Sequence, residues 1–364
     1  MRRPMAAAPV VNTRRIGRPC TGVHMTTNVI PDVVKHRSAG RQAIVPAMLM
    51  LAGIALLAAP LSAMEPSTQP SWKPIPRMQA VPQPYGQISF QRDEQEIARY
   101  HFGHGLRRPF VYPVIGPSGR PLTRWGHPHD PESHSHHYSV WISHNSVNGV
   151  SFWDDRSRGR IVHRLLEKLE DSDSAAAMTA VNEWIDEGGN NAVLLRERRR
   201  TEAVALADRE WLLIIRLELS APSRVVLGKT PFGMIGVRMA KSIGTNDGGG
   251  VIRNSEGAVN EKEVLWKPAR WVDYSGQVAS GIVEGITLMD HPRNPGHPTV
   301  FHVRGDGWMG ASLTFNGERI IEPGQPLRLC YGLYVHGGMP PPAQIDRQWR
   351  NFGAMSAELP PAKR

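Results

Sequence analysis

The sequence predicts an all-β protein: a large antiparallel β-sandwich, supersandwich-like, with few short helices. Its 364 residues include 35 glycines and 31 prolines, and so many turn formers suit many short strands. Short apolar and aromatic runs recur between these turns, without a helix-spaced pattern or an internal repeat. With 40% hydrophobic and 21% charged residues, the composition is that of a globular chain.

Residues 1–63 are expected to be a leader with a secretory signal peptide. The segment 43–63 is apolar and uncharged, follows Arg37 and Arg41, and ends on small residues, which is the order of a cleavable signal. The alternative is a single uncleaved membrane anchor, and the prolines within the segment favour the signal. We therefore expect an exported protein, periplasmic or extracellular. It would contact the membrane only if the leader stayed uncleaved.

The positive charge of the chain belongs mostly to this leader. Residues 1–63 hold eight Lys or Arg and one Asp, so they carry +7 of the net +10 and leave about +3 elsewhere. Nucleic acid is therefore a poor candidate partner. Cys330 is the one cysteine after the leader, so no internal disulfide is possible there, and we expect a small buried side chain.

The remaining chain is divided by composition. Residues 64–100 are rich in Pro and Gln and predict an extended tether, residues 101–338 the sandwich, and residues 339–364 a Pro-rich tail that frays. The predicted strands are residues 110–115, 138–143, 161–169, 177–185, 192–206, 211–219, 269–274, 281–289, 299–304, 308–314 and 326–335. Two of them, 161–169 and 192–200, contain good helix formers, but their Gly-rich turns and β-branched neighbours favour strands.

Histidines gather in one stretch, where six of the fifteen fall between His127 and His144. The pairs His127/His129 and His134/His136 are each two residues apart, so in an extended chain both members face the same side. His144 follows His136 by an even spacing and returns to that face. His136 and His144 could thus supply half of a site for one divalent or transition metal. A metal-free site that uses one histidine as acid or base is the alternative, and a solvated loop is another.

Two further stretches combine polar groups with a rigid path. In residues 290–298, three prolines fix a loop dense in Asp, His, Asn and Arg, and His302 and Arg304 then share one strand face. This loop is either a polar-ligand site or a structural loop whose Asp and Asn cap turns. In residues 271–276, Trp271 and Asp273 lie on one face and Tyr274 on the other, which suits a sugar. The alternative there is an ordinary core aromatic.

Several expected motifs are absent from the sequence. It contains no Gly-x-Ser-x-Gly, no phosphate-binding loop, no dinucleotide fingerprint and no cysteine pair. Serine hydrolases, NTPases and nicotinamide enzymes are therefore poor interpretations.

Five blocks resemble a family of bacterial proteins labelled PmoA-like, after a methane oxygenase subunit. The blocks are residues 108–112 with 119–120, His136-His137 with Trp141 and His144, residues 147–153, residues 254–257 with 271–276, and residues 290–305. The family usually reads His-His-Arg-Gly-Leu-Trp where this chain has Tyr138 and Ser139 after the histidine pair. The family label does not imply methane oxygenase activity, because a membrane methane oxygenase subunit needs several transmembrane spans and this chain has one apolar segment. The resemblance implies an exported β-sandwich protein that acts near carbohydrate breakdown.

The preferred function is an exported carbohydrate-active enzyme of lyase, epimerase or hydrolase type, whose partner is a carbohydrate or other small polar ligand. We expect His137 or His302 to act as acid or base with Asp290 as partner. The expected substrate-binding residues are Asp273, Tyr274, His291, Asn294, His297 and Arg304. A metal-dependent oxidase or oxygenase and a non-catalytic glycan-binding module are the alternatives.

Overall fold

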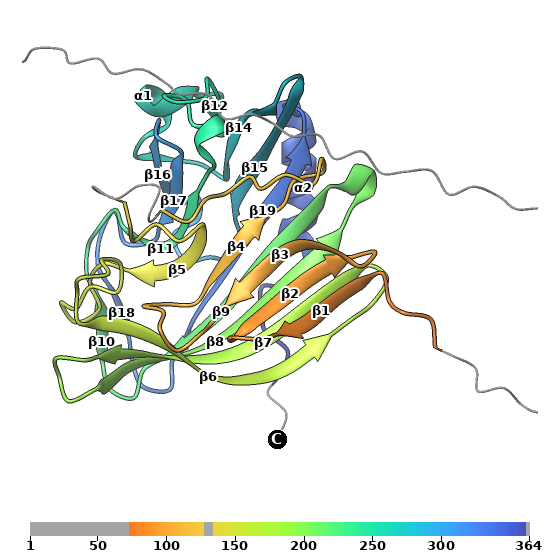
Figure 1. Ribbon diagram of the computed structural model, residues 1–364. Coiled ribbons are helices and arrows are strands. Elements are labelled where there is room, and N and C mark those ends of the chain that lie inside the picture. Colours follow the sequence, from red (N-terminus) through yellow and green to blue (C-terminus); the bar gives the residue numbers. More distant parts are fainter. Residues whose placement is uncertain (1–72, 127–133, 362–364) are drawn as a thin grey trace, which may run out of the picture. The chain divides into compact units, whose positions relative to one another are not determined.

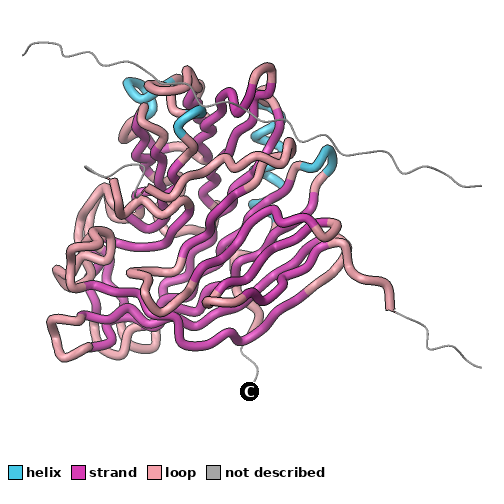
Figure 2. The backbone as a smooth tube through the Cα atoms, viewed as in Figure 1, coloured by secondary structure: helices cyan, strands magenta, loops and turns pink. Residues whose placement is uncertain are grey.

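The computed structural model describes residues 73–126 and 134–361, which form an antiparallel β-sandwich with few short helices (Figures 1 and 2). The predicted fold class is confirmed. The predicted leader and the residues His127 and His129 lie outside the described residues. Of the helices within these two ranges, none is long and apolar enough to cross a membrane.

Two sheets form the layers of the sandwich. The nine-stranded sheet has the spatial order β1 (Met78–Gln83), β2 (Gln87–Arg92), β3 (Gln95–His101), β4 (Phe110–Val114), β5 (Val140–His144), β11 (Gly233–Arg238), β17 (Trp308–Ser312), β16 (Val300–Arg304) and β13 (Lys267–Pro268). The eight-stranded sheet has the order β12 (Val251–Asn254), β14 (Trp271–Ala279), β15 (Ile282–Asp290), β19 (Leu327–Gly337), β9 (Trp211–Ser220), β8 (Ala192–Ala205), β7 (Ala175–Asp186) and β6 (Gly159–Glu170). The short strands β10 (Val225–Leu227) and β18 (Arg319–Ile321) pair with each other.

Helical segments are few and short in the described part of the chain. They are α1 (Asn260–Val264), α2 (Pro342–Ala354) and the 3-10 turns Ala207–Arg209 and Lys241–Ile243. The consecutive strands β6 to β9 form the predicted meander, and Figure 1 shows β1 to β4 lying across it. The helix formers of β6 and β8 are overridden because each strand pairs along its whole length with a neighbour.

The core lies between the two sheets, and β9 shows how the sequence builds it. Successive side chains of a strand face opposite sides, so Leu213 joins the core while Leu212 faces outward. The outward side is covered by α2, which buries Ile345 and Phe352 against it. The prediction of a fraying tail over residues 339–364 is therefore wrong for α2, whose helix is anchored by these apolar contacts.

The predicted tether, residues 64–100, is wrong from Met78 onward. The strands β1, β2 and β3 occupy this region, and Met78, Phe90 and Tyr100 are fully buried in the core. The prediction failed because proline was interpreted as excluding a strand. Pro82 lies in β1, the edge strand of its sheet, where a missing N–H is tolerated.

Candidate functional site

The outer face of the nine-stranded sheet carries an aromatic cluster that is separate from the core. Along β5, Val140 and Ile142 point into the core, so Trp141 between them points outward. The same alternation on β16 buries Val303 in the core and turns His302 outward. The outer aromatic cluster comprises Phe110, Tyr138, Trp141, Trp153 and Trp308.

Two glycines give this face a flat floor. The register of β5, β11, β17 and β16 places Trp141, Gly236, Gly310 and His302 in one row. A Cβ on Gly236 would come within 2.4–2.7 Å of three ring atoms of Trp141, and one on Gly310 would lie 3.1 Å from Cζ2 of Trp308. At Gly236 only glycine therefore lets the indole of Trp141 lie against the sheet, and a Cβ on Gly310 would also come within 2.8 Å of the carbonyl oxygen of Ile235.

A cavity of about 420 Å³ opens beside this floor. It gathers segments that are distant in the sequence: the end of the histidine stretch, the residues after β5, Phe232 before β11, and the β16–β17 hairpin. The lining residues are His134, His136, His137, Asn145, Trp153, Asp154, Phe232, His302, Arg304, Asp306 and Trp308. The predicted meeting of the two histidine-rich stretches in one pocket is confirmed for His136, His137, His302 and Arg304.

His137 is a buried residue of this lining, with 5% of its surface exposed. Its ring stacks on Trp141 at 5.1 Å and 24°, and on Trp308 at 5.7 Å and 21° between centroids. Its buried Nδ1 has no hydrogen-bond partner among the described residues. Burial, then the neighbouring charges of His136 and Arg238, hold the pKa of His137 well below its usual value, so the imidazole is neutral.

His302 approaches the same indole from β16. Its ring stands edge-on to Trp308, with centroids 4.0 Å apart at 87°, and its buried Nδ1 also has no partner in the described ranges. Burial lowers the pKa of His302 to about 4, and the charge of Arg304 adds to this effect. The site thus contains two neutral imidazoles against one tryptophan, each with an unsatisfied ring nitrogen.

A buried arginine fixes the segments that carry His136 and Trp153. Arg108 is fully buried and donates to the carbonyl of His136 at 3.1 Å, to that of Trp153 at 2.8 Å, and to Asp155 at 2.8 Å. Burial lowers the pKa of His136 to about 4, with the charge of Arg108 as the next cause. The same cation therefore positions the wall of the cavity and adds to the effect of burial on the pKa of His136.

The carboxylates of the cavity are both paired with arginines. Asp306 accepts from Arg238 at 2.9 Å, and Asp154 pairs with Arg156 at 3.2 Å. Hydrogen bonds from Arg156 lower the pKa of Asp154. The lowered pKa of Asp154 is the opposite of the raised pKa of a carboxylic acid that protonates a leaving group.

Asp290, predicted as the catalytic partner, does not line the cavity. Its carboxylate accepts hydrogen bonds from Asn294 at 2.7 Å, from His297 at 2.7 Å and from the backbone of Thr299 at 3.1 Å. His291 bonds the carbonyl of Met355 at 3.2 Å. The expectation that these residues bind or convert substrate is not supported, because their polar groups hold the loop itself and its contact with the α2 region.

Asp273 and Tyr274, predicted to bind a sugar, are fully buried elsewhere. Asp273 accepts from Arg253, Ser275, Thr287 and His336 inside the eight-stranded sheet. The hydroxyl of Tyr274 bonds backbone groups of residues 245, 304 and 305. The prediction of an aromatic sugar platform here is wrong because all of these groups are satisfied within the core.

The predicted metal pair, His136 and His144, is not brought together. His144 is fully buried and uses both ring nitrogens, bonding Thr314 at 2.8 Å and Ser146 at 3.0 Å. Within the described residues, no group of three or more His, Cys, Asp or Glu side chains is arranged to hold a metal ion. The geometry of His144 therefore suits a structural role.

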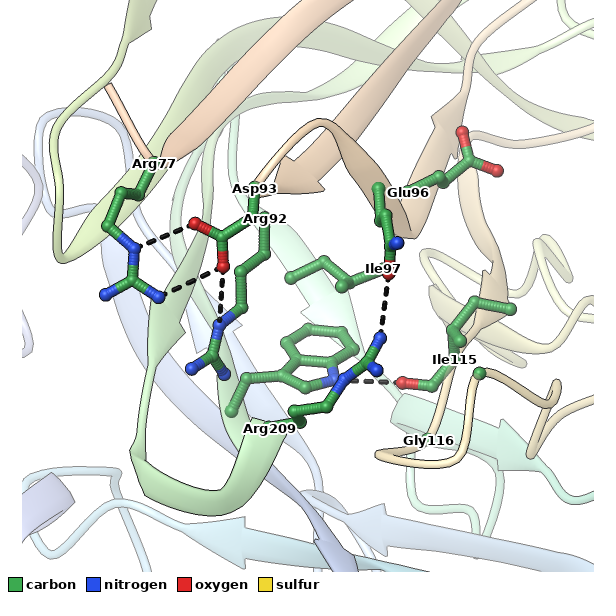
Figure 3. A pocket seen from close by; sticks show the side chains of 11 residues that line it. Arg77, Arg92, Asp93, Glu96, Ile97, Ile115, Gly116 and Arg209 are labelled. Atoms are coloured by element: carbon green, nitrogen blue, oxygen red, sulfur yellow. Dashed lines mark hydrogen bonds and ion pairs between the residues drawn. The ribbon is translucent and has the colours of Figure 1, made fainter. Parts of the chain in front are cut away.

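A larger cavity, of about 630 Å³, lies at the turns beside β2 and β3 (Figure 3). Arg77 pairs with Asp93 at 2.8 Å, Arg209 donates to Gln95 at 2.8 Å, and Arg92 donates to two backbone carbonyls. Its arginines therefore already have partners, as Figure 3 shows for Arg77 and Arg209. The histidine cavity, with its unsatisfied nitrogens, is the better candidate site.

The sequence matches the family described as "Family of unknown function (DUF6807)" over residues 87–350. The chain belongs to this family. The DUF6807 region includes every residue that lines the histidine cavity.

Two solved structures are similar to the chain at low levels. The 4-alpha-glucanotransferase of Thermococcus litoralis has a TM-score of 0.29 and 10% identity, covering 72% of this chain and 39% of its own. The GalM/aldose epimerase homologue of C. elegans has a TM-score of 0.31 and 9% identity, covering 72% of this chain and 99% of its own. The chain thus spans well under half of the glucanotransferase. No curated protein sequence matches it.

The sequence interpretation missed the aromatic residues of the histidine cavity. Trp153 and Trp308 were available signals, since Trp153 closes one of the five family-like blocks and Trp308 begins a predicted strand. Phe232 and Asn145 carried no signal of their own. His134, which was not selected as a site residue, also lines the cavity, where its ring stacks on His137 at 4.7 Å.

Proposed function

We propose that this protein is a carbohydrate-active enzyme that transfers a proton on a sugar bound in the histidine cavity, as an epimerase or lyase does. The observation that carries the proposal is the pair His137 and His302. Both are neutral imidazoles with an unsatisfied buried nitrogen, and both rest on the indole of Trp308.

The lining suits a sugar ring. A cavity of about 420 Å³ falls within the range of small-molecule sites. The indoles of Trp153 and Trp308 offer flat apolar surfaces for the C–H faces of a sugar, while Asn145, Asp306 and Arg304 offer donors and acceptors for hydroxyls. The predicted signal peptide would deliver such an enzyme to glycans outside the cytoplasm.

The electrostatics favour proton transfer over glycoside hydrolysis. A neutral imidazole can take a C–H proton of the sugar onto its unprotonated nitrogen and, as the imidazolium so formed, return that proton to the substrate. His137 or His302 can therefore act first as the base and then as the acid in one reaction cycle. Glycoside hydrolysis usually requires two free carboxyl groups, and the carboxylates of this cavity, Asp154 and Asp306, are paired with arginines.

The test compares two conservative variants with a control. Glucose, galactose, glucuronate, galacturonate and their oligomers are incubated with wild type, His137→Asn, His302→Asn and the exposed-site control His104→Asn in D₂O. Proton NMR then follows C–H exchange and new products, and saturation-transfer NMR follows binding. We expect turnover in wild type and His104→Asn, and losses of roughly 10²–10⁴-fold in the other two with binding retained.

Two outcomes would overturn the proposal. Glycan binding by wild type without turnover of any substrate would identify a non-catalytic glycan-binding module. Neither binding nor turnover across the panel would remove the carbohydrate assignment itself.

A further inference from the structure

Trp266 is an exposed aromatic residue in an unusual backbone conformation. Half of its surface is exposed to solvent, and its φ of 59° lies in the left-handed region that bulky residues rarely adopt. It lies between α1 and β13. A strained backbone conformation persists only where the surrounding structure stabilises it. The combination of strain and an exposed indole therefore favours a functional role for Trp266 more than exposure alone would.

The fold holds Trp266 beside the candidate site. Its N–H donates to the carbonyl of Phe301 at 2.8 Å, and the next residue, Lys267, pairs with Phe301 in the β13–β16 ladder. Phe301 directly precedes His302. The position of the Trp266 backbone is therefore tied to the strand that carries a proposed catalytic residue.

The ring of Trp266 extends the aromatic surface beyond the cavity. Its centroid lies 6.1 Å from that of His302 at 58°, and 6.1 Å from that of Phe315 at 40°. His302 lines the cavity and Trp266 does not, so the indole stands at the rim. Trp266 and Phe315 together form what we call the rim platform.

Charged groups surround the rim platform. Arg304, half exposed, lines the cavity and pairs at 3.3 Å with Glu261 of α1, and Glu261 also accepts from the backbone of residue 305 at 2.6 Å. Exposed Lys267 follows Trp266 directly. An isolated aromatic face among donors and acceptors suits a second sugar ring better than an apolar protein surface.

We propose that the rim platform is a second sugar subsite, so that the substrate is an oligosaccharide or polysaccharide rather than a free monosaccharide. This inference rests on the proposed function of the cavity. One sugar unit occupies the histidine cavity, and the adjoining unit of the same chain stacks on Trp266.

The experiment measures dissociation constants by titration calorimetry. The ligands are glucose, galactose, xylose, glucuronate and galacturonate, each compared with its di-, tri- and tetrasaccharide. The variants are Trp266→Ala, Trp266→Tyr and the control Tyr85→Ala, since Tyr85 is also exposed (91%) with a positive φ of 63° but lies in the β1–β2 turn.

We expect wild type to bind an oligomer more tightly than its monomer. Trp266→Ala should weaken oligomer binding about tenfold and leave monomer binding unchanged, while Trp266→Tyr and Tyr85→Ala stay close to wild type. Thermal unfolding of each variant checks that the fold is intact.

The inference is overturned if monomer and oligomer bind equally tightly through His137 and His302, or if Trp266→Ala weakens monomer binding as much as oligomer binding. In either case the proposed function stands. If wild type binds neither length of any sugar, the proposed function fails and the inference fails with it.

Discussion

The glycine floor beside the cavity can be tested by adding one methyl group, in the variant Gly236→Ala. The new Cβ would lie 2.4 Å from Cζ2, 2.6 Å from Cη2 and 2.7 Å from Cε2 of Trp141, well inside van der Waals contact. Trp141 is 1% exposed and its ring already packs on Trp153 at 5.0 Å and His137 at 5.1 Å. The indole can therefore move only by displacing its neighbours, among them Trp153 and His137.

Overpacking of this kind costs about 1–3 kcal/mol, a fraction of the free energy of unfolding of a typical domain, so the fold should survive. We expect the midpoint of thermal unfolding, followed by circular dichroism, to fall by roughly 2–10 °C. Ligand binding in the cavity should weaken as well, since His137 shifts. The matched control is Gly105→Ala, because nothing lies within 4 Å of a Cβ at that position. Equal stability and equal ligand binding in the two variants would refute the idea that the missing side chain of Gly236 makes room for the indole of Trp141.

Three further predictions follow from the burial and charge of particular residues. Arg108→Met should lower the free energy of unfolding in urea by about 3 kcal/mol because it leaves Asp155 and three carbonyls without their buried donor. Arg156→Met, at an exposed ion pair, should stay close to wild type. Similar losses in both variants would argue against an anchoring role for Arg108. Burial lowers the pKa of His144 to about 4, so the contribution of the neutral imidazole to the free energy of unfolding is complete above about pH 6.5 and declines as pH falls toward 4. At pH 5 the loss in the free energy of unfolding is about 2 kcal/mol relative to pH 7. His144→Asn should show a shallower decline of stability with falling pH, and an unchanged slope would contradict this. Phe352→Ala should lower the free energy of unfolding by about 3–5 kcal/mol because this buried ring packs α2 onto the sheet, while exposed Arg350→Ala should stay near wild type. An unchanged free energy of unfolding in Phe352→Ala would mean that α2 is not part of the folded unit.

The layered architecture could be predicted because it depends on patterns that are local in the sequence. The meander from residue 159 to residue 220 has β-branched and aromatic residues between closely spaced turns, and these features favour strands over helices. The segments at both ends were misjudged for a different reason. Pro82 and the prolines around α2 indicate turns, yet burial of Phe90 and Phe352 against distant strands determines their structure. The likeness to the PmoA-like family stays a prediction.

The candidate site could be predicted only in part, because its residues meet through strand order. Sequence reasoning placed His302 and Arg304 on one face and selected His136 and His137, and all four line the cavity. It could not know that β11 and β17 lie between β5 and β16. That order inserts two glycines between Trp141 and His302, and it is these missing side chains that open the floor.

The same register explains why polar residues near each other in sequence have different roles. Asp290 and His302 are twelve positions apart, but Asp290 ends β15 in the eight-stranded sheet while His302 lies on β16 in the other sheet. The prolines between them carry the chain from one layer to the other, and the polar groups of that loop are consumed by hydrogen bonds that fix the crossing. The histidines thus divide into two groups. His144 and His297 bond within the fold through their ring nitrogens, whereas His137 and His302 each have a buried ring nitrogen without a partner among the described residues.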